Sequence, residues 1–312
     1  MSKKVIDQES GADWSLYNAD CVDLMRQMPA CSVDLSIYSP PFSTLYTYSE
    51  SVCDMGNTAT DSEFLEQYAF AARELYRVTR PGRIAAVHCK QLVNYQNRDG
   101  RSGWRDFRGD LIRAHEAQGW QYHSEIVIWK CPVIEMQRTK TQRLLYKTLR
   151  TDASLTGIGM PEYLLLFRRW PENDEEQVAQ MPIEHPVGDE GSEIPLDVWQ
   201  QWASPVWMDI RQTNVLNVKE ARGDKDEKHL CPLQLDLIKR AIYMWSNRGE
   251  VVFSPFAGIG SEGVVSLELG RKFVGTELHS KYFAQAKRNL ADAERQASSP
   301  SLFDWAKEAA QA

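Results

Sequence analysis

The chain has 312 residues, of which 43% are hydrophobic and 10% aromatic, so it can bury a full core as one large domain or as one domain with a smaller insertion. Its formal net charge of −7 excludes a protein that coats nucleic acid over its whole surface, but it leaves room for a local basic patch. No segment approaches the roughly 18 apolar residues that a membrane span needs, and residues 1–10 contain no apolar signal core, so the cytoplasm is the expected compartment.

Short apolar runs predict strands, most of them separated by helical patterns or turn signals. Strands are expected near residues 14–17, 33–38, 83–89, 123–129, 162–168, 251–254 and 273–277. Strands interleaved with helices indicate an α/β sheet with parallel crossovers.

Two helices are predicted from apolar side chains at helical spacing. The first covers residues 61–80, where Asp61 or Ser62 can cap it and a Pro-Gly pair ends it. The second covers about 232–246 and has a proline in its first turn. From roughly 171 to 228 the sequence becomes rich in proline, glycine and charge, so we expect an irregular excursion from the sheet there.

The predicted strand at 33–38 runs directly into the sequence Ser39-Pro40-Pro41-Phe42. A proline has no N–H to continue a sheet, and the residue before a proline is kept out of the helical conformation, so the chain is held in a rigid, extended corner. Taken alone, such a corner is most often only the end of a strand.

Basic residues concentrate between positions 136 and 151, in a run without acids. Its members are Arg138, Lys140, Arg143, Lys147 and Arg150. Such a run is either a solvated helix face or a surface that meets phosphates, and the sequence leaves both readings open.

A glycine-containing turn lies near the other end of the chain. The strand at 251–254 runs into a turn with Gly258 and Gly260, then into a helix, and then into a second strand that ends at Glu277. The glycines let the backbone approach a ligand closely, and the acid can accept both hydroxyl hydrogens of a ribose, so the ligand should contain a nucleoside.

The same turn also satisfies G-x-G-x-x-G, which keeps a NAD-dependent oxidoreductase open as an alternative. Three features argue against it. Too little chain follows residue 250 to complete a nicotinamide-binding half, and the sequence Ser-Pro-Phe separates the strand from the glycines. An oxidoreductase also gives the proline corner no role.

With both features in place, the chain resembles the DNA amino-methyltransferases of the β arrangement, in which the catalytic motif precedes the cofactor motif. The family tetrapeptide (S/D/N)-P-P-(Y/F) is matched by residues 39–42, and the D-P-F-x-G-x-G loop by residues 254–260. Residues 18–20 match the turn that touches the cofactor adenine, and residues 229–234 are similar to the segment before the cofactor strand. The resemblance covers most of residues 14–292, in the family's order.

The resemblance implies an α/β fold with a Rossmann-like seven-stranded methyltransferase sheet, flanked by helices and interrupted by an irregular target-recognition insertion. It divides the chain into a catalytic half at 1–130, a late strand plus insertion at 131–228, a cofactor-binding half at 229–295 and a tail at 296–312. The implied enzyme uses S-adenosyl-L-methionine to methylate DNA, as in restriction–modification systems, in the cytoplasm of a bacterium or of a phage-infected bacterium. A homodimer is compatible with this assignment.

The resemblance also gives roles to individual residues. A base amine is a poor nucleophile, because its lone pair is delocalised, and acceptors aimed at its two N–H groups favour a pyramidal nitrogen. Those acceptors are the Ser39 hydroxyl and the Pro40 carbonyl, while Pro41 holds the corner and Phe42 stacks on a base extruded from double-stranded DNA. The expected cofactor-binding residues are Asp20, His229, Ser254, Phe256, Gly258, Gly260 and Glu277, and the expected DNA-binding residues are those of the basic run.

Two positions depart from the family pattern, because Ser254 stands where aspartate is usual and residues 229–234 lack the usual lysine. No metal is expected, since the six cysteines include neither a C-x-x-C pair nor a close histidine partner.

Serine in the first motif position is associated in this family mainly with N4 of cytosine, and aspartate with N6 of adenine, so cytosine N4 is the expected target. Adenine remains an alternative, because both amines present two N–H groups. The same tetrapeptide also occurs in enzymes that methylate RNA bases or glutamine amides, and a non-catalytic nucleic-acid-binding module with the same fold is the alternative from another class.

Overall fold

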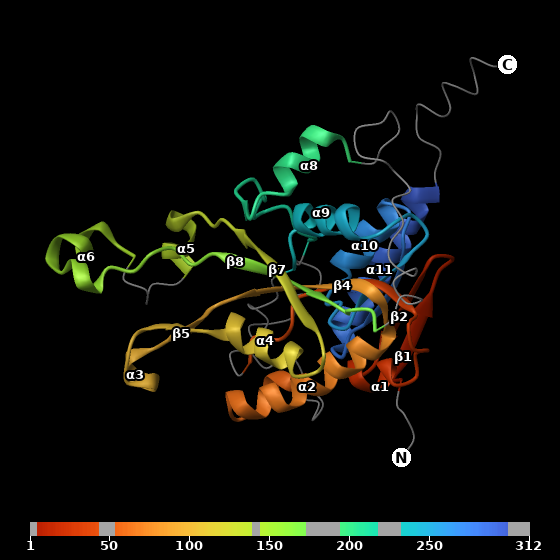
Figure 1. Cartoon of the computed structure of the whole chain (residues 1–312), viewed down its shortest axis with the longest axis horizontal. Coiled ribbons are helices and arrows are strands. Elements are labelled where there is room, and N and C mark those ends of the chain that lie inside the picture. The colour runs from red at the N-terminus through yellow and green to blue at the C-terminus, as the bar shows by residue number, and fades with distance from the viewer. Residues whose placement is uncertain (1–4, 44–53, 139–143, 173–193, 218–231, 299–312) are drawn as a thin grey trace.

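The computed structural model describes residues 5–43, 54–138, 144–172, 194–217 and 232–298. Among these residues, one sheet of nine strands forms the centre of the molecule and carries helices on both faces (Figure 1). In spatial order the strands are β1 (Asp7–Ser10), β2 (Trp14–Asn18), β11 (Lys272–Thr276), β10 (Val251–Ser254), β3 (Val33–Tyr38), β4 (Thr79–Lys90), β8 (Glu162–Arg168), β7 (Gln121–Ile128) and β9 (Val206–Trp207).

The seven strands predicted from the sequence all lie in this sheet, and two further strands extend its edges. Strands β2, β11, β10, β3 and β4 run parallel, whereas β8 is antiparallel to both of its neighbours, so the parallel crossover expected throughout fails at this strand. Strand β9 was not predicted, because a two-residue strand is too short to show an alternating pattern.

The predicted excursion at 171–228 contains more regular structure than expected. It holds α8 (Leu196–Trp202) and the edge strand β9, which pairs with β7 in parallel. The Trp207 side chain anchors this segment, because it is 1% exposed and its indole N–H donates to the Trp202 carbonyl over 2.9 Å. Residues 173–193 and 218–231, which include the acidic stretches, lie outside the described residues.

Helices α1 (Cys21–Met25), α2 (Asp61–Val78) and α4 (Phe107–Glu116) cover one face of the sheet, and α9 (Leu235–Trp245), α10 (Ser261–Glu268) and α11 (Ser280–Ser298) cover the other (Figure 1). Apolar side chains on both faces form the core, with Phe64 and Phe107 buried on the first and Ile238 and Val265 on the second. The burial of both sheet faces explains why the central strands read as nearly continuous apolar runs.

Both predicted helices exist, with shifted ends. Helix α2 is capped by Thr60 rather than by Asp61 or Ser62, because the Thr60 hydroxyl accepts from the Glu63 N–H while the Glu63 carboxylate accepts from the Ala59 N–H. The Pro-Gly pair lies inside β4 and begins three residues beyond the end of the helix. Helix α9 begins at Leu235, so the proline precedes it instead of lying in its first turn.

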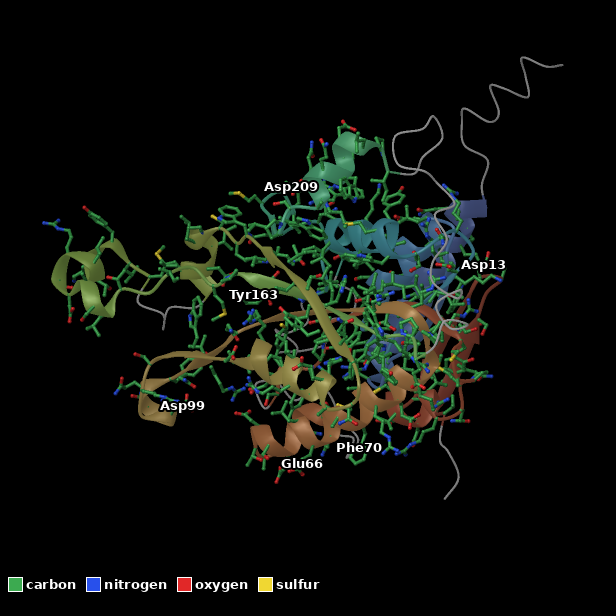
Figure 2. The ribbon with its side chains drawn as sticks, viewed as in Figure 1. Asp13, Glu66, Phe70, Asp99, Tyr163 and Asp209 are labelled. Atoms are coloured by element: carbon green, nitrogen blue, oxygen red, sulfur yellow. The ribbon has the colours of Figure 1, made fainter. Side chains whose placement is uncertain are left out.

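Two excursions project from the same end of the molecule (Figure 1). One is the hairpin of β5 (Leu92–Asn94) and β6 (Gly103–Arg105), with α3 (Gln96–Asp99) at its tip. The other carries α5 (Pro132–Arg138) and α6 (Tyr146–Thr151). Figure 2 shows side chains crowded between the sheet and its helices and sparse along these two arms, where Asp99 marks the tip of the hairpin.

The chain order reverses between β10 and β3. From β10 the chain continues through α10 to β11 on one side, and from β3 it continues through α2 to β4 on the other. Ligand sites of open α/β sheets lie at such a reversal, beyond the carboxyl ends of the strands. Among the described helices, none combines the length and the apolar character that crossing a bilayer requires.

Candidate active site

A cleft opens beyond the carboxyl ends of β2, β3, β10 and β11. It encloses about 1080 Å³ of empty space, including solvent at its mouth, which is enough for a ligand and part of a second molecule. The sequence-predicted residues that line it are Asp20, Ser39, Pro40, Pro41, Phe42, Phe256, Gly258 and Glu277. The structure therefore brings the proline corner and the glycine turn, more than 200 residues apart, to the same cleft.

Among the described residues, the predicted Ser254 and Gly260 do not line the cleft. Ser254 is fully buried in β10, and its hydroxyl has no hydrogen-bond partner among the described residues. Gly260 is the N-cap residue directly before α10 and has a φ of +87°, and a Cβ there would lie 3.3 Å from the Ala286 Cβ on α11. His229 lies outside the described residues.

Gly258 faces the cleft. Its φ of +54° lies in the left-handed region that favours glycine, and a Cβ at this position would meet nothing within 4 Å. The open space in front of its backbone is part of the cleft, so a ligand can approach this turn closely.

The Glu277 carboxylate is held in a fixed orientation at the end of β11. Its Oε2 accepts from the Gly258 N–H over 2.8 Å, and its Oε1 accepts from the His279 N–H over 2.7 Å. Burial nevertheless raises the pKa of Glu277 to about 7, although these two N–H groups oppose the shift. Each oxygen retains a second lone pair with which it can accept a hydrogen bond from a ligand hydroxyl.

The cleft is lined by acids. The carboxyl groups of Asp20, Asp54, Glu262 and Glu277 contribute to it, and its described lining includes no lysine or arginine. Burial raises the pKa of Asp20, and it raises the pKa of Glu262 to about 8. These acids would attract a positively charged ligand, whereas a pyrophosphate would meet repulsion.

Asp20 has two roles in the structure. Its carboxylate caps α1 by accepting from the Asp23 N–H over 3.0 Å, and its side chain also lines the cleft. The neighbouring Asn18 is 1% exposed and joins β2 to the turn after β11, because its amide donates to the carbonyls of Glu277 and Leu278. This contact keeps the acid at the end of β11 close to the turn at residues 18–20.

The proline corner is anchored at both of its ends. Before it, the buried Tyr38 hydroxyl lies 3.0 Å from the Tyr68 hydroxyl and 3.2 Å from Nε2 of His115. After it, Ser43 adopts a φ of +52° and its hydroxyl donates to Asp61 at the start of α2. A non-glycine residue rarely holds this conformation, so the chain is forced to turn sharply directly after the motif.

Phe42 is half-buried at the edge of the cleft. Its ring centroid lies 6.2 Å from that of Phe107 on α4, and the Lys90 ammonium lies 5.9 Å from the Phe42 centroid. These neighbours hold the ring in place while part of it stays accessible. The arrangement offers a flat aromatic surface with a cation beside it.

Behind Ser39, buried polar side chains continue away from the cleft. The Ser39 Oγ lies 3.3 Å from Nδ1 of His88, and Nε2 of His88 lies 3.2 Å from Oε2 of Glu162. The other oxygen of Glu162 pairs with the Lys130 ammonium at 2.8 Å. Gln234 also donates to Glu162.

The ionisation of Glu162 is set by these partners. Burial by itself would raise the pKa of this carboxyl, but the hydrogen bond from His88 and the charge of Lys130 hold the pKa well below its usual range. Glu162 is therefore an ionised carboxylate inside the protein, whereas burial raises the pKa of Glu262 and of Glu277.

Sequence reasoning missed this network and Glu262. His88 is near the end of one predicted strand and Glu162 begins another, so polar residues at strand ends were the available signal. Glu262 was concealed inside the G-x-G-x-x-G pattern, as one of its unspecified positions. No sequence spacing indicates that a residue on β4 and a residue on β8 meet.

The basic run is only partly described. Lys147 and Arg150 lie exposed on α6, in the arm that projects from the sheet (Figure 1). Arg138 ends α5, whereas Lys140 and Arg143 lie outside the described residues. Neither Lys147 nor Arg150 lines the cleft.

Comparison with known proteins gives consistent matches. The model of the DNA methylase family N6_N4_Mtase matches residues 33–288. The chain is 40% identical over 279 residues to the DNA adenine methyltransferase YhdJ of Escherichia coli K12, a match that covers 88% of this chain and 82% of that protein. It is 24% identical over 264 residues to the type II methyltransferase M.BamHI of Bacillus amyloliquefaciens, covering 84% of this chain but 54% of the relative, so it spans about half that protein's length.

The fold also matches solved structures. The TTHA0409 protein of Thermus thermophilus, in its complex with S-adenosyl-L-methionine, aligns with a TM-score of 0.60 at 19% sequence identity. The alignment covers 91% of this chain and 96% of that one. At this identity the likeness concerns the fold, and it includes the arrangement of helices around the mostly parallel sheet.

Proposed function

This chain belongs to the N6/N4 DNA methylase family, and from that membership we propose that it transfers a methyl group from S-adenosyl-L-methionine to an exocyclic amino group of a base in DNA. The observation that carries the proposal is the meeting of Ser39-Pro40-Pro41-Phe42 with the turn at 255–260 in one cleft. Neither motif alone distinguishes an active site from a strand end.

The residues of the cleft fit S-adenosyl-L-methionine. This cofactor carries a sulfonium and an ammonium, which suit a cleft lined by acids. The described residues that line the cleft include no lysine or arginine. The free lone pairs of Glu277 can accept from the ribose hydroxyls, and Gly258 leaves room for the ligand. The same lining disfavours the pyrophosphate of a nicotinamide dinucleotide, which argues against the oxidoreductase.

When bound, S-adenosyl-L-methionine supplies the electrophilic methyl group. The protein's part is to hold the amine in line with it, with the Ser39 hydroxyl and the Pro40 carbonyl accepting from the two N–H groups. Such positioning is worth on the order of 7–11 kcal/mol in well-oriented reactions. Phe42 stacks on the base, which must leave the double helix to enter the cleft.

The target that Ser39 favours is N4 of cytosine, since a serine in the first position of the motif accompanies that base in most of the family. Adenine N6 is the second candidate, because the 40% identical relative is named an adenine methyltransferase. The amines of both bases present two N–H groups to Ser39 and Pro40. The fit of the base in the cleft therefore decides which base is methylated.

DNA is expected to lie against the two projecting arms. Lys147 and Arg150 are exposed on one arm, where they can meet phosphates, and Lys90 adds a cation beside Phe42. In this proposal residues 131–228 carry recognition of the target, residues 1–130 and 229–295 form the catalytic and cofactor halves, and the protein acts in the bacterial cytoplasm. A homodimer is compatible with the exposed apolar residues of α6, Tyr146 and Leu149.

One experiment tests the reaction and the base together. The full chain is incubated with isotopically labelled S-adenosyl-L-methionine and double-stranded DNA, the DNA is digested to nucleosides, and these are separated by mass spectrometry. Labelled N4-methylcytidine supports the first candidate and labelled N6-methyladenosine the second, both as deoxynucleosides. Label in RNA or in a glutamine-containing peptide, with none in DNA, would overturn the proposal, as would binding of NAD in place of the cofactor.

A further inference from the structure

The buried network behind Ser39 has a defined direction of hydrogen bonding. Glu162 is ionised and paired with Lys130, so its oxygen opposite Nε2 of His88 can only accept a hydrogen bond. Nε2 of a neutral His88 must therefore carry the ring proton. Nδ1 is then left as an acceptor, and the Ser39 hydroxyl, 3.3 Å away, must donate to it.

This direction matters for the base amine. A serine hydroxyl can donate or accept, and only its lone pairs help a nitrogen whose N–H groups point at it. With its hydrogen engaged by His88, Ser39 presents nothing but lone pairs to the cleft. An aspartate in the same place would be an acceptor without assistance, whereas a serine needs a partner that takes its hydrogen.

We propose that His88, held by Glu162, is a positioning residue that keeps the Ser39 hydroxyl in its accepting orientation and receives the proton that the methylated amine releases. The proposal rests on the function proposed above. It assigns roles to His88, Glu162 and Lys130, which neither the tetrapeptide nor the cofactor loop contains.

The proton step is balanced as follows. The nitrogen lone pair forms the new N–C bond while the S–C bond of the cofactor breaks, and the nitrogen becomes positively charged. One of its N–H protons passes to Oγ of Ser39 while the Oγ–H proton passes to Nδ1 of His88. The serine is unchanged, the amine is neutral, and the imidazolium is paired with Glu162 until it loses its proton to solvent.

The charges around His88 permit this step. Glu162 at the start of β8 faces Nε2, Lys130 after β7 neutralises part of that carboxylate, and Gln234 before α9 contributes a neutral amide. Ser39 at the end of β3 is the neighbour on the cleft side. When His88 gains a proton, the Glu162 carboxylate lies between the two cations, the His88 imidazolium and the Lys130 ammonium.

The first test compares His88→Gln with the parental protein in single-turnover methyl transfer to DNA. The variant should be roughly 10- to 100-fold slower, because Ser39 loses the partner that takes its hydrogen. His123→Gln is the matched control, because His123 is exposed on β7 of the same sheet. A His88→Gln variant with the parental rate would overturn the proposal.

The second test separates positioning from a general loss of structure. In a Ser39→Ala background, His88→Gln should slow methyl transfer by less than about threefold, because the hydroxyl through which it acts is absent. A full effect in that background would overturn the proposal and make His88 a structural residue. S-adenosyl-L-methionine affinity, measured by calorimetry, should be equal in all four proteins. If the parent itself transfers no methyl group to DNA, the proposed function fails. If the parent does transfer it, but the effects of Ser39→Ala and His88→Gln simply add in the double variant, only this inference fails.

Discussion

The buried carboxylates in the cleft and those behind Ser39 are held in opposite ways. At the end of the cleft that is proposed to bind the cofactor, the cofactor end, Glu262 and Glu277 have no lysine or arginine among the described lining residues, and burial raises the pKa of both. Behind Ser39, at the proposed catalytic end, Glu162 lies between His88 and Lys130, which hold its pKa well below the usual range. Carboxylates without a cation prepare a site for a charged ligand, whereas a carboxylate that is already paired fixes the geometry of its neighbours.

The largest effect should come from Ser39→Ala, which removes the acceptor at the catalytic end. Turnover should fall roughly ten- to a thousandfold, by analogy with the loss of one hydrogen-bonding group that stabilises a transition state. Cofactor affinity should stay at the parental value, because Ser39 is not one of the acids at the cofactor end. Single-turnover kinetics and calorimetry measure the two quantities separately.

Ser39→Asp is the matched variant, since it supplies an acceptor that does not depend on His88. It should retain more activity than Ser39→Ala, and parental turnover in Ser39→Ala would remove the corner from the chemistry.

The next largest effect should come from Glu277→Ala at the opposite end. Loss of its hydrogen bonds to a ribose should weaken S-adenosyl-L-methionine binding by about 1.5–3 kcal/mol. In the parent, affinity should also decline as the pH falls through about 7, because the carboxyl then takes up a proton and loses its negative charge. Isothermal titration at several pH values measures both effects.

Glu268→Ala serves as the control, because Glu268 ends α10 on an exposed surface. Equal affinities for Glu277→Ala and the parent would show that Glu277 does not touch the cofactor.

Phe42→Ala should have a smaller effect, on base capture alone. Loss of stacking should weaken DNA binding in the presence of a cofactor analogue by on the order of 1–3 kcal/mol, as for aromatic residues in single-strand binders. Phe42→Tyr should restore most of that affinity, since the ring is retained. Fluorescence of a base analogue at the target position reports the capture, and an unchanged signal in Phe42→Ala would exclude stacking.

The smallest effect concerns the stability of the cofactor-free protein. The folded pKa of Glu262 is about 8, above its ordinary value of 4.5, so its contribution to stability is complete below about 4.5 and lost as the pH rises through 8. Glu162 has the opposite sign, because its pKa is lowered and its contribution is lost as the pH falls below the ordinary value. The melting temperature should fall by a few degrees between pH 5 and 8, and Glu262→Gln should flatten this slope.

If the melting temperature of Glu262→Gln falls with pH as steeply as that of the parent, the ionisation of Glu262 does not destabilise the folded protein. Saturating S-adenosyl-L-methionine should raise the melting temperature of the parent, and the rise should be largest at high pH, where the carboxylates are ionised.

The sequence predicted those parts of the site that are continuous along the chain. Residues 39–42 directly follow the buried strand β3, and residues 254–260 begin at the last residue of β10, so their place at the edge of the sheet could be predicted. The contact of His88 with Glu162 could not, because it depends on β8 running antiparallel beside β4, with Lys90 paired to Glu162. A register of this kind is set by the whole sheet and has no local signal.

The positions of the central strands could also be predicted, because strands that are buried on both faces are mostly apolar. The edges were harder. The burial pattern of β1 is mostly exposed, and β9 is two residues long, so neither presents an apolar run. Helix ends shifted by one to a few residues where a capping side chain, such as that of Thr60, decided the boundary.

The position of β10 and β11 in the sheet has a consequence for how the protein is made. These strands come from residues 251–276, yet they lie between β2 and β3, which are formed from residues 14–38. On the ribosome, the two early strands therefore have to wait for more than 200 further residues before their partners are synthesised. Until then the inner edges of β2 and β3 are unpaired and available to other strands, so the nascent chain is exposed to incorrect strand pairing.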